Sequence, residues 1–159
     1  MPSAYVKVDR SAHGADAIAY AMNHVIGYDA ADRRRHISGV NMLPAGVVPF
    51  PEQMRIYWSK MDARHKVEIV NCAVAFEREE LDSGCPRDCM RALEIGRAIA
   101  KANAPDCQSA VFVGERDGKI EINILTNDVR ISDHKSLGLK VCSRSRFRVV
   151  VDKVCAAYK

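Results

Sequence analysis

The chain has 159 residues, of which 48% are hydrophobic and 28% charged, and its formal net charge is +4. This composition is ordinary for a folded protein, and the length favours a single domain over residues 1–159. No apolar run reaches the roughly 18 residues of a membrane span, and the first residues, MPSAYVKVDRSAHG, lack the apolar segment of a signal peptide. We therefore expect a cytoplasmic protein with no membrane span.

The first half of the chain predicts one strand and two helices. Alternation over Ser3–Asp9 indicates a strand, and apolar residues at helical spacing indicate a helix over Gly14–His24, with Tyr20 off its apolar stripe. Residues 27–50 are expected to be irregular, because Asp, Arg, Gly and Pro are dispersed through them. Residues Glu52–Arg64 have apolar side chains at three- and four-residue steps and predict the second helix.

The second half predicts three strands and two helices. The apolar run Val67–Phe76 indicates a central strand, and a helix is expected from Ser83 to about Ala102. Gln108–Glu115 and Lys119–Asn127 then form a hairpin, and Ser143–Tyr158 forms a basic helix. This order predicts an α+β fold, in which helices pack on one face of a largely antiparallel sheet. The other face would then be available for a ligand.

The hairpin carries the first candidate site. Asp117-Gly118 suits a two-residue turn with positive φ at both positions, and this turn places Gly114 opposite Glu121. Glu121 and Asn123 share one strand face, and the absence of a side chain at Gly114 leaves space across from the carboxylate. Carboxylate and amide oxygens are suitable ligands for a hard divalent cation. The alternative is an ordinary solvated strand surface.

Other features indicate nucleic-acid chemistry. The triplet Arg33-Arg34-Arg35 and the C-terminal residues 134–159, which contain seven Lys or Arg and a single Asp, suit a polyanion. The alternative is a solvated helix face. The Tyr20 phenol can act as a nucleophile toward phosphorus if cations screen the phosphate, or it can simply be a surface tyrosine. Without a secretion signal the six cysteines are expected to be thiols, with a metal pair at Cys85 and Cys89 as the alternative.

Six segments follow one another in the order and local pattern of a known family. They are AIAYAMN (17–23), ISGVNM (37–42), VNCAVAF (70–76), ALEIGRAIAKANAPDCQSAVFV (92–113), KIEINILTNDV (119–129) and SRFRVVVDKVCAAY (145–158). Together they resemble the N-terminal nuclease domain of plasmid and transposon mobilization relaxases, the group with a His-hydrophobic-His metal motif. The resemblance covers nearly the whole chain.

The resemblance implies a relaxase-like sandwich that nicks single-stranded DNA during mobilization. It assigns the nucleophile to Tyr20, and it places Mg²⁺ or Mn²⁺ on Glu121 and Asn123. It also implies that other mobilization proteins are partners. The arginines expected to bind backbone phosphates are Arg33, Arg34, Arg35, Arg144, Arg146 and Arg148.

The chain departs from the family at the metal motif. Relaxases of this group usually supply three histidines, and the matching positions here are Gly114, Glu121 and Asn123. Glycine cannot ligate through a side chain, so another group would have to complete the site. The candidates, among which the sequence does not choose, are His13, His24, His36, His65 and His134.

Two other hypotheses remain open at this point. The first is a catalytically degenerate relaxase-fold module, which binds single-stranded DNA or a partner protein without cleavage. The second is an unrelated α+β domain with no preference for DNA over other polyanions.

Overall fold

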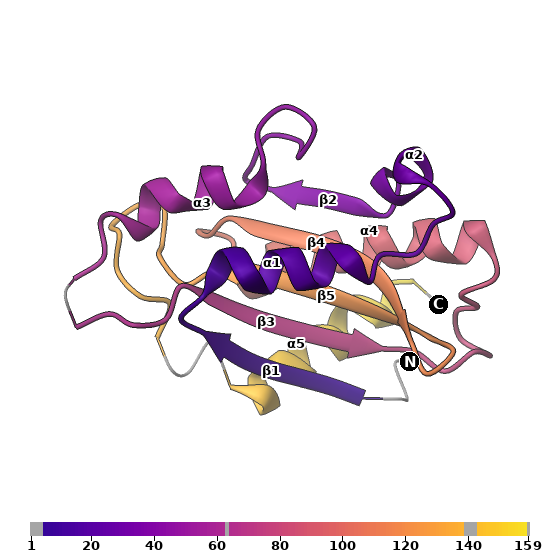
Figure 1. The fold of residues 1–159 in the computed structure, drawn as a ribbon. Coiled ribbons are helices and arrows are strands. Elements are labelled where there is room, and N and C mark those ends of the chain that lie inside the picture. Colours follow the sequence, from indigo (N-terminus) through magenta and orange to yellow (C-terminus); the bar gives the residue numbers. More distant parts are fainter. Residues whose placement is uncertain (1–4, 63, 139–142, 159) are drawn as a thin grey trace.

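A computed structural model describes residues 5–62, 64–138 and 143–158. Its strands and helices alternate along most of the chain (Figure 1). In chain order they are β1 (Tyr5–Ser11), α1 (Gly14–Asn23), α2 (Ala30–Arg34), β2 (Ile37–Val40), α3 (Phe50–Trp58), β3 (Ile69–Ala75), α4 (Pro86–Asn103), β4 (Ser109–Arg116), β5 (Lys119–Asn127) and α5 (Arg144–Ala156). The predicted start of the first strand, at residues 3 and 4, and Cys142 lie outside the described residues.

The strands form one antiparallel sheet in the order β1-β3-β5-β4-β2 (Figure 1). The predicted hairpin register is confirmed, with Gly114 opposite Glu121 across the β4–β5 pair. The turn has the positive φ angles that its residues suggested, 53° at Asp117 and 76° at Gly118. The α+β class with an antiparallel sheet is therefore confirmed.

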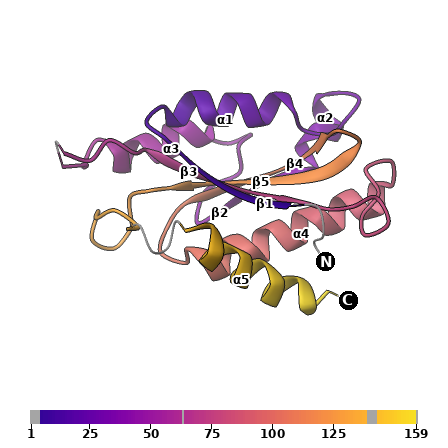
Figure 2. The same ribbon diagram turned by 90° about the horizontal axis from the view of Figure 1, so that it is seen from below.

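Helices α4 and α5 pack together on one face of the sheet (Figure 2). The isoleucines of β5 at positions 120, 122 and 124 point to this side and join its core. Helix α4 approaches closely at Gly96, where a Cβ atom would lie 2.6 Å from Cγ1 of Val111. One layer of the structure thus matches the expectation of helices packed on a sheet face.

The opposite face is not left open, because α1 and α3 lie over it (Figure 2). The apolar stripe of α1, with Ile18 and Ala21, must also be buried, and it packs in a second core with Phe112 and Leu125 of the sheet. Met54 of α3 joins the same core. Only the part of this face beside α1 can therefore hold a ligand.

The prediction that residues 27–50 are irregular is wrong. It contains α2, where the Asp29 side chain accepts a hydrogen bond from the Asp32 backbone N–H at 2.8 Å, and the short edge strand β2, which pairs with β4. A four-residue edge strand depends on a partner far along the chain, so the local pattern does not reveal it. The predicted helix over Glu52–Arg64 begins at Phe50 and ends at Trp58.

Two smaller expectations concern membranes and thiols. Within the described ranges, no helix combines the length and apolar character that crossing a bilayer requires. Cys85 and Cys89 form no disulfide. Burial, the largest cause, raises the pKa of the Cys89 thiol to about 11.

Candidate functional site

A cavity of about 370 Å³ lies between the C-terminal part of α1 and the sheet. It brings together Tyr20 of α1 with Glu121 and Asn123 of β5, the three residues that the sequence proposed as nucleophile and cation ligands. Its other lining residues come from α1, β1, β3 and the β4–β5 hairpin: Lys7, Asp9, Ala21, His24, Asn71, Ala73, Gly114, Glu115 and Arg116.

Glu121 is a buried carboxylate, not a solvated strand residue. Its relative exposure is 8%, although it stands on the polar face of β5. The Asn123 side-chain amide donates a hydrogen bond to Oε1 at 3.2 Å, whereas Oε2 has no hydrogen-bond partner. The Arg116 guanidinium lies 4.0 Å from Oε2, which is too far for a hydrogen bond. Burial raises the pKa of Glu121, and the hydrogen bond from Asn123 opposes this effect.

Asn71 of β3 adds a second unsatisfied acceptor to the same cavity. Its side-chain Oδ1 is buried without a hydrogen-bond partner. Buried polar atoms are normally paired, so two orphaned oxygens in one cavity suit a ligand that brings hydrogen-bond donors or positive charge. The described residues contain no group of three His, Cys, Asp or Glu side chains placed to hold a metal ion. A cation here would therefore need amide oxygens among its ligands.

Backbone fills the space beside Gly114, across from Glu121. A Cβ atom at Gly114 would lie 2.7 Å from the carbonyl oxygen of His24. Val25 forms an isolated antiparallel bridge with Gly114, and the Ile26 N–H donates to the Val113 carbonyl at 3.0 Å. The space expected across from Glu121 is thus occupied, and Gly114 is required by the approach of the α1 end to β4.

His24 is the candidate histidine that lines this cavity. Its Nδ1 lies 2.8 Å from the Tyr20 carbonyl oxygen. Because a carbonyl can only accept, Nδ1 donates, and Nε2 of the neutral ring is left with its lone pair. The His24 and Tyr20 rings stack with centroids 4.4 Å apart. The i, i+4 spacing of these two residues, on the helix predicted over Gly14–His24, is a sequence signal that could have indicated this contact.

The other four candidate histidines make contacts elsewhere. His13 is the N-cap residue at the opposite end of α1. The His36 ring contacts the Ile26 carbonyl, His65 pairs with Asp128, and the His134 ring packs against Tyr57.

Tyr20 is accessible from solvent and has charged neighbours. Its side chain is 69% exposed at the edge of the cavity. Lys7 and Asp9 of β1 form an ion pair at 3.1 Å and also line the cavity. Lys7 and Arg116 are the two cationic residues of the lining, which also contains the carboxylates of Asp9, Glu115 and Glu121. The phenol thus stands at the solvent edge of a cavity that Glu121 and Asn71 also line.

The six predicted phosphate-binding arginines fall into two groups. Arg33 and Arg34 lie in α2 and Arg35 caps its C-terminus, all exposed and on the side of the sheet that carries α1 (Figure 2). The second group, in α5, lies on the opposite face of the sheet (Figure 2). Its members are Arg144, Arg146 and Arg148. The structure therefore does not bring the α5 arginines to the Tyr20 cavity.

Comparison with protein-family models, with curated proteins and with solved structures found no match to this chain. The fold and the cavity define an antiparallel α+β domain in which an exposed tyrosine and a buried carboxylate line the same cavity.

Proposed function

We propose that the protein is a relaxase-like DNA strand transferase, which nicks single-stranded DNA through Tyr20 during plasmid or transposon mobilization. The main support is the convergence of Tyr20, Glu121 and Asn123 on one cavity, although they are separated by about a hundred residues of chain. Further support comes from the side-chain oxygens of Glu121 and Asn71 that have no hydrogen-bond partner. A plain strand surface would have left the carboxylate in water.

The residues present fit a hard divalent cation. The groups that would hold Mg²⁺ or Mn²⁺ are the side-chain oxygens of Glu121, Asn71 and Asn123, with Nε2 of His24 in place of the usual third histidine. Such a cation, when bound, would polarise the scissile phosphate and stabilise the negative charge that builds up on it.

The chain itself supplies the nucleophile and screens the phosphate. The Tyr20 phenol oxygen attacks the phosphorus, and the bond between phosphorus and the 3′ oxygen breaks. The phenol loses its proton to water, and the 3′ oxygen takes one up, which leaves a 5′-phosphotyrosyl adduct and a free 3′-hydroxyl. Lys7 and Arg116 line the same cavity as the tyrosine and would offset the charge of the phosphate. The reverse reaction reseals the strand.

The arginines of α2 supply affinity for the DNA backbone. Arg33, Arg34 and Arg35 are exposed on the same side of the sheet as Tyr20, where they can contact a strand that extends beyond the cavity. Contacts of this kind neutralise phosphates without reading sequence, and they make binding sensitive to salt. The α5 arginines face away and contribute little to this strand.

A degenerate module that binds DNA without cutting it is the second candidate. The observation that favours it is the lack, among the described residues, of three charged or imidazole ligands arranged for a metal. In that case Arg116, 4.0 Å from Glu121, balances the carboxylate in part, and Tyr20 only contacts DNA.

One experiment separates the two candidates. The protein is mixed with Mn²⁺ and an end-labelled pool of single-stranded oligonucleotides, and the products are run on a denaturing gel. We expect a covalent protein–DNA band that is absent with Tyr20→Phe. Salt-sensitive binding on a native gel without any such band, for wild type and Tyr20→Phe alike, would support the binding module instead.

A further inference from the structure

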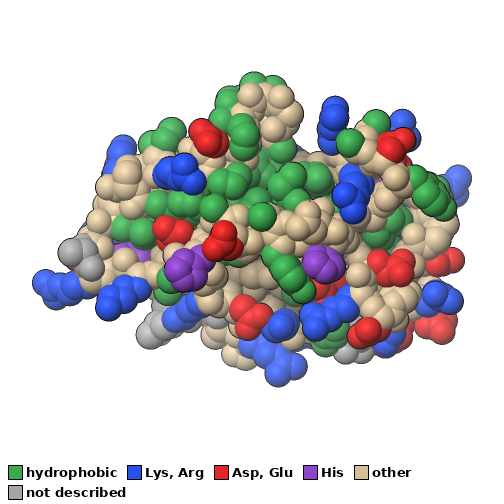
Figure 3. Space-filling model, viewed as in Figure 1, with side chains coloured by type: hydrophobic (Ala, Val, Ile, Leu, Met, Phe, Trp, Pro, Cys, Tyr) green, Lys and Arg blue, Asp and Glu red, His purple; other side chains and the backbone are tan. Residues whose placement is uncertain are grey.

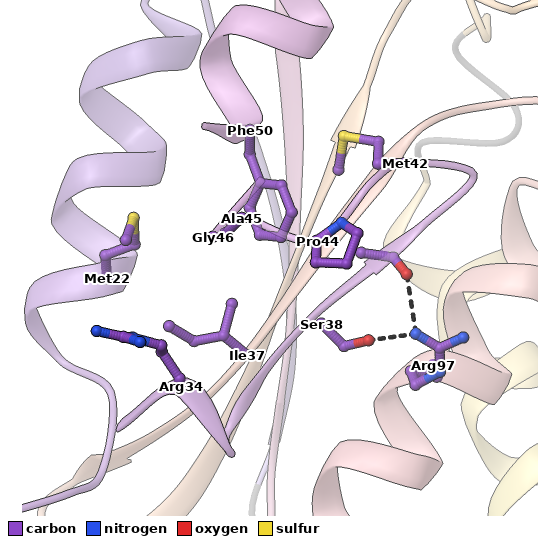
Figure 4. A pocket seen from close by; sticks show the side chains of 11 residues that line it. Met22, Arg34, Ile37, Ser38, Met42, Pro44, Ala45, Gly46, Phe50 and Arg97 are labelled. Carbon is purple, nitrogen blue, oxygen red and sulfur yellow. Dashed lines mark hydrogen bonds between the residues drawn. The ribbon is translucent and has the colours of Figure 1, made fainter. Parts of the chain in front are cut away.

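A second cavity, of about 580 Å³, lies on the other side of α1 against the edge strand β2 (Figure 4). Most of its wall is apolar. Met22 comes from α1, Ile37 from β2, Met42 and Pro44 from the following loop, and Phe50 from the start of α3. In the space-filling view of this face, hydrophobic side chains gather in the area between α1 and that loop (Figure 3). The volume is within the range of about 300–1,000 Å³ that small-ligand sites occupy.

Two arginines stand on opposite sides of this cavity (Figure 4). Arg97 of α4 reaches the edge of β2, where its Nη1 donates to the Gly39 carbonyl oxygen at 2.8 Å and to the Ser38 hydroxyl. These two bonds fix the guanidinium and leave its other N–H groups for a ligand. Arg34 of α2 lies across from it. Neither guanidinium forms an ion pair with a carboxylate in the part of the chain that the structure describes.

Apolar walls with a guanidinium on either side suit a nucleobase. A base has two apolar faces that can lie against Met22, Met42 and Pro44, and its edge carries acceptor atoms that guanidinium groups bind well. The phosphate attached to the same nucleotide suits the second arginine. A purely apolar ligand would make no use of either guanidinium.

The structure disfavours a peptide strand as the occupant. β2 is an edge strand that pairs only with β4, so a peptide could extend the sheet there. The Gly39 carbonyl, however, already accepts from Arg97, and an added strand would need that acceptor. A blocked edge is a common protection against strand addition.

The two cavities flank the same end of α1. Ala21 lines the Tyr20 cavity and Met22, the next residue, lines the cavity beside β2. A single strand that crosses the end of α1 can therefore place a phosphate beside Tyr20 and a nearby nucleotide in the second cavity.

We propose that the cavity between α1 and β2 binds one unstacked nucleotide of single-stranded DNA, with its base against the methionines and its polar groups on Arg34 and Arg97. This inference rests on the proposed function and adds to it a subsite that holds the strand while the tyrosine reacts.

Methionine methyl NMR tests the proposal directly. The full chain is labelled with ¹³C at methionine methyls and titrated with each deoxynucleoside monophosphate, and then with short dT and dA oligonucleotides. We expect saturable shifts of the Met22 and Met42 methyls. Met90, which is 43% exposed on α4 and lines neither cavity, is the internal control and should not move. If the methyl signals of both Met22 and Met42 stay unchanged with every one of these ligands, the proposal is wrong.

A variant that fills the cavity between α1 and β2 provides a second, independent test. A Cβ atom at Gly46 meets nothing within 4 Å, so Gly46→Phe adds a ring at the cavity without a backbone clash. We expect it to weaken oligonucleotide binding roughly 5-fold or more, the low end for loss of one stacked base. The matched control is Val47→Phe, at a neighbouring side chain that is 68% exposed and does not line the cavity. Equal affinities of the two variants would contradict a nucleotide in this cavity.

The covalent assay keeps this proposal separate from the proposed function. If Met22 and Met42 shift and Gly46→Phe binds weakly while no Tyr20 adduct forms, the subsite stands and the strand-transfer activity fails. If the adduct forms but neither methyl shifts, the activity stands and the subsite is wrong.

Discussion

The carbonyl oxygen of His24 occupies the space that a side chain at Gly114 would need, 2.7 Å from an ideal Cβ position. From the sequence alone, Gly114 looks like a lost metal ligand opposite Glu121. In the structure it is the residue that lets the end of α1 reach β4, and His24 at that end also lines the Tyr20 cavity. The glycine and the histidine are therefore two parts of one arrangement.

Gly114→Ala should destabilise the protein. The added methyl would push against backbone, which cannot rotate away as a side chain can, and such overpacking costs roughly 1–3 kcal/mol of unfolding free energy. Urea unfolding measures the change. The control is Gly84→Ala, whose Cβ would lie 3.5 Å from Asp82 Oδ1, an ordinary contact. Equal stability of Gly114→Ala and wild type would mean that α1 is free to move off β4.

Glu121→Gln should stabilise the protein at neutral pH in the absence of divalent ions. Because the folded-state pKa of Glu121 is raised by burial, the folded chain holds this proton more tightly than the unfolded chain. The free energy of unfolding therefore falls as the pH rises from the ordinary carboxyl pKa through the raised one, and glutamine avoids that loss.

Thermal unfolding across a pH series checks this prediction. The advantage of Glu121→Gln over wild type should be present above the raised pKa and should vanish below the ordinary one, where the glutamate is protonated in both states. Asp128 also has a raised pKa, but it is common to both proteins and cancels in the difference. Glu115→Gln, at an exposed neighbour, should show no such pattern. An advantage that does not depend on pH would argue against a buried charged carboxylate.

Divalent cations should stabilise the wild-type protein. A ligand that binds only the folded state adds about 2.7 kcal/mol at a hundredfold excess over its Kd. Mn²⁺ should raise the Tm, and EDTA should restore the original value. Glu121→Gln should abolish the increase and His24→Ala should reduce it. His13→Ala, at the other end of α1, should leave it intact. If Mn²⁺ raises the Tm of wild type and Glu121→Gln equally, the cation binds at another site.

The two arginine groups should contribute differently to DNA binding. Arg35→Ala should weaken binding and reduce the dependence of log K on log salt, by about 0.7 per lost phosphate contact on a single strand. Arg146→Ala should change neither, because α5 lies on the far face of the sheet. Fluorescence anisotropy over a salt series measures both slopes. A larger effect of Arg146→Ala than of Arg35→Ala would indicate that the DNA strand binds on the α5 side of the sheet.

The parts of the fold that local chemistry specifies could be predicted from the sequence. The β5 bounds, Lys119–Asn127, and the register across the hairpin both follow from the Asp117-Gly118 turn and from alternating isoleucines. By contrast, β2 could not be predicted, because its four residues are held as a strand by pairing with β4, about seventy residues away.

The candidate site divides in the same way. Tyr20, Glu121 and Asn123 could be named from residue type and resemblance. The roles of His24 and Asn71 could not, since they depend on how α1 crosses the sheet and on which β3 side chains are left beneath it. Helix α1 covers this face because its own apolar stripe must be buried. The expectation of one open sheet face did not take that stripe into account.

The measurement that tests the central claim most directly is mass-spectrometric mapping of the covalent product. The full chain is incubated with Mn²⁺ and single-stranded oligonucleotides, and it is then digested with nuclease and protease. We predict a phosphonucleotide on the peptide that contains Tyr20, absent from Tyr20→Phe and from Glu121→Gln. Adduct on another residue, or none at all on a protein that binds the same DNA, would contradict strand transfer by Tyr20.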